Sequence, residues 1–417
     1  MISEATNHRL TRIEGQAPMG DLLRRYWHPI AGASELDTAP IKPLRLFGEE
    51  LVLYRDRSGE HGLIDRRCPR RSADLANGYV DAEGLRCGYH GWNLNADGAV
   101  SAMPYDDVVM PGSRLKELCT IPAYPVRELA DLLWAYFGPL PAPELPVWEM
   151  FTRTQGFCES VISAVPCNWL QCQENAIDPV HFEWLHENWP AAMESQAAEG
   201  RRHVRVAFDE FEQGLTYRRL REGMSESDEM WTVGRVCLWP NAFYLGDHIE
   251  WRVPVDDENT LSISWFHTRV PIESEPYGQA RIPTWRSPIR DSEGRWITSH
   301  VIDQDIVGWV GQGRIVDRTR EHLSLSDKGI AMLRRRLLRD LDACAEGRDP
   351  SGLIRDSVEA RCATLSDANA HYGDPMSRAE WLAHPFLGRR ALGNPWACGQ
   401  PAAVRAEFLA AMGLPDD

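Results

Sequence analysis

Three side chains that can bind or orient a metal ion lie close together in the stretch 175–186. Asp178, His181 and His186 fall within nine residues, in an otherwise apolar and aromatic setting. Non-haem Fe(II) centres that activate O₂ use two imidazoles and one carboxylate as ligands and leave other coordination positions open. Here the carboxylate would come from elsewhere in the chain. The alternative is a pair of half-buried histidines on an amphipathic helix.

The spacing of these residues sets a condition on the backbone. Asp178 and His181 are three residues apart and are neighbours on one helix face. His181 and His186 are five residues apart, which separates them by about 140° on a regular helix. Both can reach one metal ion only if the helix is bulged, kinked or ended between them. Pro179 favours such an irregularity, either as the first helical residue behind an Asp cap or as a kink.

A second group of metal-binding residue types lies upstream. Cys68-Pro-Arg70 is followed by sixteen residues, 71–86, and then by Cys87-Gly-Tyr-His90. A Rieske 2Fe–2S centre needs two such loops, and each loop supplies one cysteine and one histidine. The second loop is complete, whereas in the first loop Arg70 stands where the spacing requires histidine.

Length and composition limit the possible classes of protein. A chain of 417 residues is long enough for two domains and a substantial core. The net charge of −16, from 45 basic and 61 acidic residues, argues against nucleic acid or an anionic membrane as a partner. We expect no transmembrane helix and no secretory signal. The ten cysteines therefore indicate thiols or metal ligands in a cytoplasmic protein, not a disulfide framework.

The predicted elements favour an α+β fold. Short strand-like runs broken by turn residues predict a small antiparallel β domain. The proline-dense segment 138–146 is the best domain boundary. Further strand-like runs, interspersed with helices, follow it and fit the α+β pattern. They are 214–218, 242–245, 249–255 and 260–269.

Helical spacing predicts three further elements. One helix begins near Gly20 and extends to Ile30, where Pro29 stops it. A second spans 326–343 and includes the charge run Arg334–Arg336, most simply interpreted as a solvated face. A short third helix is expected at 402–412.

The chain resembles the α subunit of a Rieske non-haem iron aromatic-ring oxygenase, in the branch of the phthalate dioxygenases and aryl-ether O-demethylases. The resemblance extends over nearly the whole length and implies an N-terminal helical segment (1–37), a Rieske 2Fe–2S domain (38–145) and a catalytic domain (146–417). In that family a helix-covered antiparallel sheet forms the catalytic domain. The motifs that carry the resemblance are Gly15–Trp27, Cys68–Leu75, Leu85–Trp92, Tyr124–Glu128, Asn168-Trp169, Asn175–His186 and Asp317–Leu323.

The resemblance assigns ligands to an iron–sulfur cluster. It implies that Cys68, Cys87 and His90 hold a Rieske 2Fe–2S cluster, with Arg70 at the fourth ligand position. A guanidinium stays protonated and offers no lone pair, so we expect this cluster to be under-ligated, lower in potential or absent. Arg70 has three competing explanations. It is an accidental or engineered change in an active enzyme, or a natural change that accompanies loss of the cluster. In the third, the cluster is kept with an unusual ligand.

The resemblance also implies a mononuclear Fe(II) bound by His181, His186 and a carboxylate from farther along the chain. The stretch 303–313 resembles the family segment that supplies this carboxylate. Gln312 and Gly313 lie seven and eight residues after Asp305, and this spacing selects Asp305; Asp303 is the alternative.

Asp178 would be the family's bridging carboxylate. It would accept hydrogen bonds from iron-bound His181 and from the cluster-bound His90 of a neighbouring subunit. An N-cap role for Asp178 is compatible with this. Arg252 and Arg269 are candidates to orient a substrate carboxylate, although a structural or surface role is the simpler expectation for each.

The implied activity is that of a terminal oxygenase component. It would take NAD(P)H electrons from a separate reductase or ferredoxin, activate O₂ at Fe(II), and hydroxylate or O-demethylate an aromatic carboxylate or aryl ether. The implied assembly is a homo- or hetero-oligomer built on a trimer. The alternative is a cluster-deficient subunit of a hetero-oligomeric oxygenase, dependent on an intact partner or only structural. A zinc hydrolase that uses the two histidines is a third hypothesis.

Overall fold

The computed structural model describes residues 2–193, 200–384, 387–388 and 399–415. The chain divides into two compact units: Met1–Leu23 together with Pro143–Asp417, and Arg24–Ala142. The division between Ala142 and Pro143 lies inside the proline-dense segment. Residues up to Leu23 belong to the larger unit, and the three-part division at 37/38 and 145/146 stays a prediction.

The unit Arg24–Ala142 contains three small antiparallel sheets, with strand orders β1-β11-β10, β2-β3-β4-β9 and β5-β6-β7-β8. Two of the hairpins turn through two-residue loops in which both residues have positive φ, Phe47-Gly48 and Ala130-Asp131. Such loops match the twist of the flanking strands. The strands are β1 (Trp27–Gly32), β2 (Ile41–Leu46), β3 (Glu49–Arg55), β4 (His61–Asp65), β5 (Tyr79–Val80), β6 (Leu85–Arg86), β7 (Asn93–Leu94), β8 (Val100–Ala102), β9 (Ala123–Tyr124), β10 (Val126–Leu129) and β11 (Leu132–Tyr136).

The larger unit is built on an eight-stranded sheet of order β13-β14-β15-β16-β17-β18-β12-β19. Neighbouring strands are antiparallel, except that β19 runs parallel to β12. The strands are β12 (Gly156–Val165), β13 (His203–Phe211), β14 (Gly214–Arg221), β15 (Arg235–Leu238), β16 (Ala242–Leu245), β17 (His248–Asp256), β18 (Asn259–Arg269) and β19 (Thr284–Arg286). The predicted α+β class, a small β domain and a helix-covered antiparallel sheet, is confirmed.

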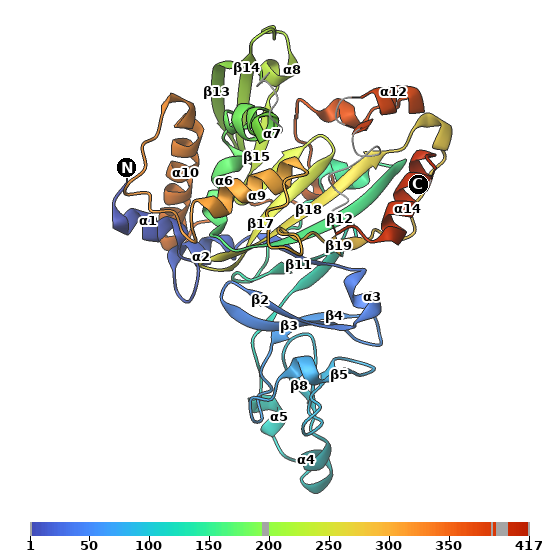
Figure 1. The fold of residues 1–417 in the computed structure, drawn as a ribbon. Helices are drawn as coiled ribbons and strands as arrows, with labels where there is room; N and C mark the ends of the chain where they lie inside the picture. The colour runs from blue at the N-terminus through green and yellow to red at the C-terminus, as the bar shows by residue number, and fades with distance from the viewer. Residues whose placement is uncertain (1, 194–199, 385–386, 389–398, 416–417) are drawn as a thin grey trace. The chain divides into compact units, whose positions relative to one another are not determined.

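Helices α6 (Trp169–Ala176) and α9 (Val301–Gly311) lie across this sheet (Figure 1). Ile302, Ile306 and Trp309 of α9 pack with Cys172 of α6 against strands β12 and β18. The burial of these apolar side chains fixes both helices to the sheet. Among the described residues, none of the helices has the length and apolar character that spanning a bilayer requires. The other helices of this unit with five or more residues are α1 (Glu4–Thr11), α2 (Pro18–Leu23), η3 (Phe182–Asn188), α7 (Trp189–Met193), α10 (Lys328–Ala345), α12 (Arg378–Ala383) and α14 (Ala402–Met412).

Two of the helix predictions are confirmed and one is wrong in its extent. The predicted helices 326–343 and 402–412 correspond to α10 and α14. The predicted helix from Gly20 to Ile30 is wrong beyond Leu23, because α2 ends there and β1 pairs with β11. All residues of β1 are buried, and the spacing of a short, wholly buried run does not distinguish a helix from a strand.

The charge run Arg334–Arg336 is not a solvated face, and that prediction is wrong for two of its three residues. Arg334 and Arg336 are 6% and 1% exposed. Arg336 donates to the backbone carbonyls that join β13 to β14, at Phe211 (2.6 Å), Glu212 (2.5 Å) and Gly214 (2.6 Å). It therefore satisfies backbone acceptors that would otherwise be buried without partners.

Arg334 belongs to a buried ion network centred on Glu174. The Glu174 carboxylate accepts hydrogen bonds from Arg334 Nε at 2.6 Å and from Arg318 Nη2 at 2.7 Å. Burial alone would raise the pKa of Glu174, but the two guanidinium groups outweigh it and lower the pKa below its ordinary value. Because Glu174 lies in α6, the network joins this helix to α10.

We expect Glu174→Ala to destabilise the larger unit by about 3–5 kcal/mol, because it leaves two buried guanidinium groups without their carboxylate. The control is Asp342→Ala, which removes the exposed ion pair with Arg9 and should change stability by less than about 1 kcal/mol. Urea unfolding followed by circular dichroism measures both values. Equal effects of the two substitutions would contradict a central role for this network.

Candidate functional site

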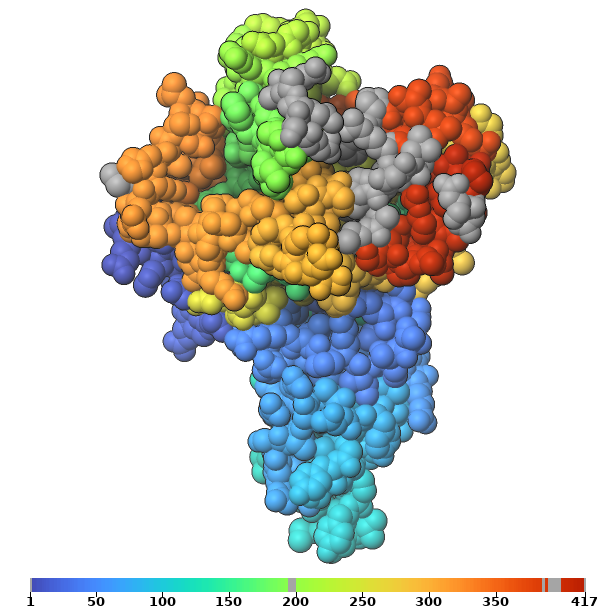
Figure 2. Space-filling model, in the orientation of Figure 1, coloured from blue at the N-terminus to red at the C-terminus, as the bar shows by residue number. Residues whose placement is uncertain are grey.

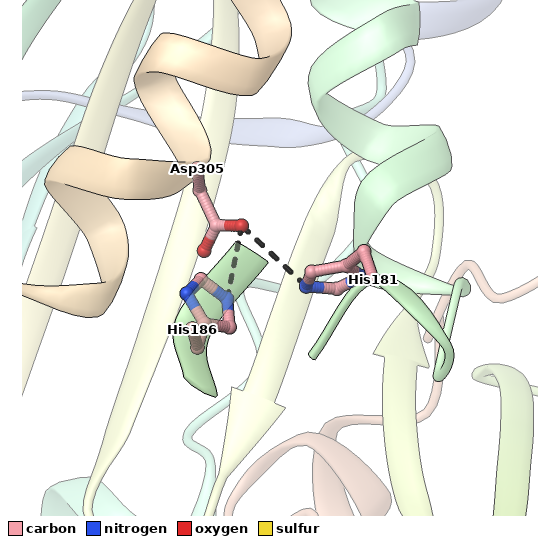
Figure 3. A group of neighbouring side chains, drawn as sticks. All are labelled: His181, His186 and Asp305. Atoms are coloured by element: carbon pink, nitrogen blue, oxygen red, sulfur yellow. Dashed lines mark ion pairs between the residues drawn. The ribbon is translucent and has the colours of Figure 1, made fainter. Parts of the chain in front are cut away.

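The predicted metal ligands His181, His186 and Asp305 converge on one point between η3 and α9 (Figure 3). Asp305 Oδ1 lies 3.5 Å from His181 Nε2 and 3.3 Å from His186 Nε2. One ligand atom from each residue lies within 4.8 Å of the others, and the described part of the chain holds no second group of this kind. The donor set of two imidazole nitrogens and one carboxylate oxygen fits a single metal ion with open coordination positions.

A π-helix brings the two histidines to the same face. η3 is π-helical, and the N–H of Trp189 that follows it bonds the carbonyl of Trp184, five residues earlier. Residues five apart therefore lie on the same side of the helix, and the ring centroids of His181 and His186 are 5.1 Å apart. The predicted departure from a regular helix between the two histidines is confirmed.

Two carboxylates fasten the π-helix to the edge of the large sheet. Glu183 accepts hydrogen bonds from the backbone N–H of His203 at 2.8 Å and pairs with its Nδ1 at 2.9 Å. Glu187 accepts two hydrogen bonds from the guanidinium of Arg221, one of them from Nη1 at 2.8 Å. These contacts hold η3 against β13 and β14 and limit how far its histidines can rotate. In Figure 2, η3 and α7 (green) and α9 (orange-yellow) adjoin on one face of the molecule.

Two amide side chains orient the candidate ligands. Gln304 donates from Nε2 to the carbonyl of Thr298 at 3.0 Å, so its Oε1 accepts from His186 Nδ1 at 2.8 Å. With a proton on Nδ1, the lone pair of Nε2 faces Asp305 and the metal position. Asn175 donates to Asp305 Oδ1 at 3.1 Å. Neither role is predictable from the sequence, because neither residue has a ligand-like spacing.

Asp303, the alternative ligand, has a different role. Its carboxylate accepts from the backbone N–H of His300 at 3.2 Å and from the Ser299 hydroxyl at 3.3 Å, as part of the capping box of α9. Burial raises the pKa of Asp303 to about 7. The structure thus places Asp305, and not Asp303, beside the two histidines.

Asp178 combines a capping role with contact to a candidate ligand. Its Oδ1 accepts from the backbone N–H of Val180 at 2.8 Å, and its Oδ2 lies 3.7 Å from His181 Nδ1. Burial alone would raise the pKa of Asp178, but His181 and the backbone N–H groups of Val180 and His181 outweigh it and lower the pKa. An ionised Asp178 favours a proton on His181 Nδ1, which leaves His181 Nε2 free to face the metal position.

The two cysteine loops of the smaller unit have the same backbone hydrogen bonds. Cys68 N–H bonds the carbonyl five residues later (2.9 Å), and Cys87 N–H does the same (2.8 Å). In each loop the residue four positions after the cysteine, Ser72 or Gly91, has positive φ and donates to the cysteine carbonyl. Both cysteines are buried, at 3% and 1% exposure. Burial and the neighbouring Cys87 thiol raise the pKa of the Cys68 thiol.

His90 and Arg70 stand at the other two of the four predicted ligand positions. Desolvation and the cations of Arg70 and Arg71 lower the pKa of His90, so its imidazole is neutral and able to bind metal. The guanidinium carbon of Arg70 lies 5.7 Å from the ring centroid of Trp92. Cys68, Cys87 and His90 are residue types that a Rieske cluster uses, whereas Arg70 is not, because a guanidinium offers no lone pair.

Arg252 and Arg269, the two candidates for substrate binding, are both paired within the protein. Arg252 Nη2 lies 2.6 Å from Glu250, and Arg269 Nη2 lies 2.5 Å from Glu275. One nitrogen of each guanidinium is thus paired with a carboxylate, which favours the structural role for each, although Nε of both residues and Nη1 of Arg252 are buried without a hydrogen-bond partner among the described residues.

Comparisons with known proteins agree with this geometry. Residues 26–125 match the Rieske [2Fe-2S] domain family. The chain is 55% identical to the 5,5'-dehydrodivanillate O-demethylase oxygenase subunit of Sphingobium sp., over 85% of this chain and 84% of that protein. It is 30% identical to the phthalate 4,5-dioxygenase oxygenase subunit of Pseudomonas putida, over 91% of this chain and 96% of that protein.

The fold also resembles that of a solved structure, Pseudomonas putida CBB5 NdmA with caffeine. The TM-score is 0.58 at 21% sequence identity, over 81% of this chain and 97% of that chain. The chain belongs to the Rieske non-haem iron oxygenases, and it is an oxygenase component of that family. The family and the enzyme class predicted from the sequence are confirmed.

We expect Asp305→Asn to abolish stoichiometric iron binding without unfolding the protein, because the amide provides no anionic ligand. Asp303→Asn is the matched control on the same helix, and it should retain iron because Asp303 serves only the helix cap. Iron content by metal analysis after anaerobic loading, with circular dichroism as the folding check, measures the difference. Loss of iron in the Asp303 variant with retention in the Asp305 variant would reverse the assignment.

Proposed function

We propose that this chain binds Fe(II) through His181, His186 and Asp305 and oxygenates an aromatic substrate beside that ion. The observation that supports the proposal best is the convergence of the three side chains, with both imidazoles oriented by hydrogen-bonding partners. A ferrous ion held there would supply O₂ activation. The chain itself holds the three ligands on two fixed helices and leaves coordination positions for O₂.

We propose O-demethylation of a methoxylated aromatic compound as the reaction. The relative with 55% identity is an O-demethylase oxygenase subunit, whereas the relative with 30% identity is a dioxygenase oxygenase subunit. The balanced demethylation consumes the methoxyarene, O₂, NADH and a proton, and it yields a phenol, formaldehyde, water and NAD⁺. Hydroxylation of the ring by the same centre is the alternative outcome.

The electron donor and the assembly are further parts of the proposal. A separate reductase or ferredoxin would supply the electrons, as the designation of the relatives as oxygenase subunits suggests. The proposed assembly is a homo- or hetero-oligomer built on a trimer. In it, Asp178 would connect His181 with His90 of a neighbouring subunit, and a carboxylate between two imidazoles suits that role.

Arg70 decides whether this chain can hold its own 2Fe–2S cluster. The pocket as it stands supplies Cys68, Cys87 and His90, so we expect a weakly held or absent cluster. A chain without a cluster would depend on an intact partner subunit for electrons, because its iron ligands are nevertheless complete. This is the one observation that favours the cluster-deficient subunit as a second candidate function.

We expect Arg70→His to raise the inorganic sulfide content to about two per chain and to produce a Rieske-type EPR signal after reduction, because it restores the fourth ligand. Arg71→His is the matched control: Arg71 is exposed, and its guanidinium carbon lies 5.6 Å from the Tyr89 ring centroid. It should leave the sulfide content unchanged. A full complement of sulfide in the unmodified chain would contradict the expected ligand defect.

We expect the iron-loaded Arg70→His protein, reduced with dithionite and exposed to O₂, to convert 4-hydroxy-3-methoxybenzoate to the catechol with one formaldehyde per phenol formed. The additional substitution His181→Ala should abolish both products, because it removes an iron ligand. With ¹⁸O₂, a product that keeps its methoxy group and contains two labelled oxygens would indicate dioxygenation. No oxygenated product from a panel of methoxyarenes and aromatic carboxylates would contradict the proposed function.

A further inference from the structure

Three arginines surround Phe182, the residue directly after the candidate ligand His181. The guanidinium carbons of Arg219, Arg221 and Arg235 lie 4.3, 5.8 and 5.8 Å from the Phe182 ring centroid. Such a concentration of positive charge is unusual in a chain whose net charge is −16. Three cations close together repel one another, so each needs a compensating partner.

Two of these arginines have such a partner within the protein. Arg221 is held by the Glu187 carboxylate of η3 through two hydrogen bonds. Arg235 Nε donates to Asn369 at 2.8 Å, and the buried Asp367 carboxylate lies near enough to raise the pKa of Arg235 against the effect of burial. Their charges are therefore already compensated.

Arg219 differs from both neighbours. It is 5% exposed, its Nε is buried without a hydrogen-bond partner, and no carboxylate of the described residues lies within ion-pair distance. Its one hydrogen bond within the described chain is a long one, 3.5 Å, from Nη1 to the carbonyl of Pro179. Burial and the neighbouring Arg235 lower its pKa to about 10, although Tyr217 and the more distant Glu187 carboxylate act in the opposite direction. The guanidinium is still charged at neutral pH.

The position of Arg219 relates this unpaired charge to the metal site. Pro179 lies between Asp178 and His181 in the sequence, and the Phe182 ring, over which Arg219 lies, has its centroid 5.2 Å from that of His186. Burial would lower the pKa of His186, but Asp305 and Gln304 outweigh it and raise that pKa, and the positive charge of Arg219 opposes them only weakly. An anion bound by Arg219 would thus lie next to the proposed iron.

A buried cation without a partner is costly, and proteins usually avoid it unless a ligand supplies the counter-charge. A carboxylate is the planar anion that matches the guanidinium donors in a paired geometry. We propose that Arg219 binds the carboxylate of an aromatic substrate and so positions its ring beside the metal site. The inference rests on the proposed function and narrows its substrate class to aromatic carboxylates.

The test compares two ligands that differ in the charge of the carboxyl group and in one methyl group. We use 4-hydroxy-3-methoxybenzoate and its methyl ester, and measure Kd for each by calorimetry with the anaerobic, iron-loaded full chain. Arg219→Gln should weaken binding of the acid about 10- to 100-fold, the value of one charge-assisted contact, and leave Kd for the ester unchanged. Arg218→Gln is the matched control, because Arg218 lies next to Arg219 on β14 but pairs with the more exposed Asp209.

A thermal measurement separates substrate binding from a structural role. In the absence of ligand, Arg219→Gln should leave Tm equal to or above that of the unmodified protein, because it removes an uncompensated buried charge. A structural arginine would lower Tm and weaken binding of acid and ester alike. Guanidinium ion added to Arg219→Ala should restore part of the affinity for the acid.

The inference is overturned if the unmodified chain binds the acid no more tightly than the ester, or if Arg219→Gln affects both ligands equally. The binding assay requires no turnover and no cluster, so its outcome is independent of catalysis. Preferential binding of the acid without any oxygenation would retain this inference and contradict the proposed function. Oxygenation of both ligands, bound with equal affinity, would contradict this inference and retain the proposed function.

Discussion

The proposed iron-ligand group depends on one departure from regular helical geometry. On an α-helix, His181 and His186 would point about 140° apart, and the π-helix η3 removes that separation. A π-helix is rare and must be held by its surroundings. Glu183 and Glu187 fasten η3 to the sheet edge. On the side of α9, Gly308 faces Leu185 of η3, and a methyl group at Gly308 would lie in van der Waals contact with Leu185, at 3.4 Å. This close packing keeps Asp305 within reach of both histidines.

The same strand serves the metal ligands and the proposed substrate anion. Arg219 and Arg221 are two residues apart on β14, so both point to one face of the sheet. Arg221 binds Glu187 and thereby holds the π-helix, whereas Arg219 lies over Phe182 without a carboxylate partner among the described residues. One rigid strand therefore sets the distance between the metal ligands and the cation. Oxygenation at a fixed ring position requires such a fixed distance, because small misplacements reduce reactivity strongly.

Much of the site could be predicted because ligand chemistry is local in the sequence. The residue types and spacing of His181 and His186 predicted both the metal and the irregular helix between them. The choice of Asp305 over Asp303 needed the family resemblance, since only the tertiary structure shows that Asp303 caps α9. The roles of Gln304, and the burial of Arg334 and Arg336, depend on partners distant in the chain. A run of charged residues on a helix favours a solvated face, and the buried partner Glu174 is too distant in the chain to be recognised from the sequence.

The proposed mononuclear site has all three of its ligand residues, whereas the cysteine loops have three of the four that a Rieske cluster uses. The backbone of both cysteine loops is set by hydrogen bonds at each cysteine and by positive φ at Ser72 and Gly91. None of these features involves the side chain of Arg70. A change from imidazole to guanidinium at that position therefore removes a metal ligand without removing the loop that would present it. These backbone hydrogen bonds are thus independent of the side chain at position 70, and one side chain separates the three proposed ligands from a complete Rieske ligand set.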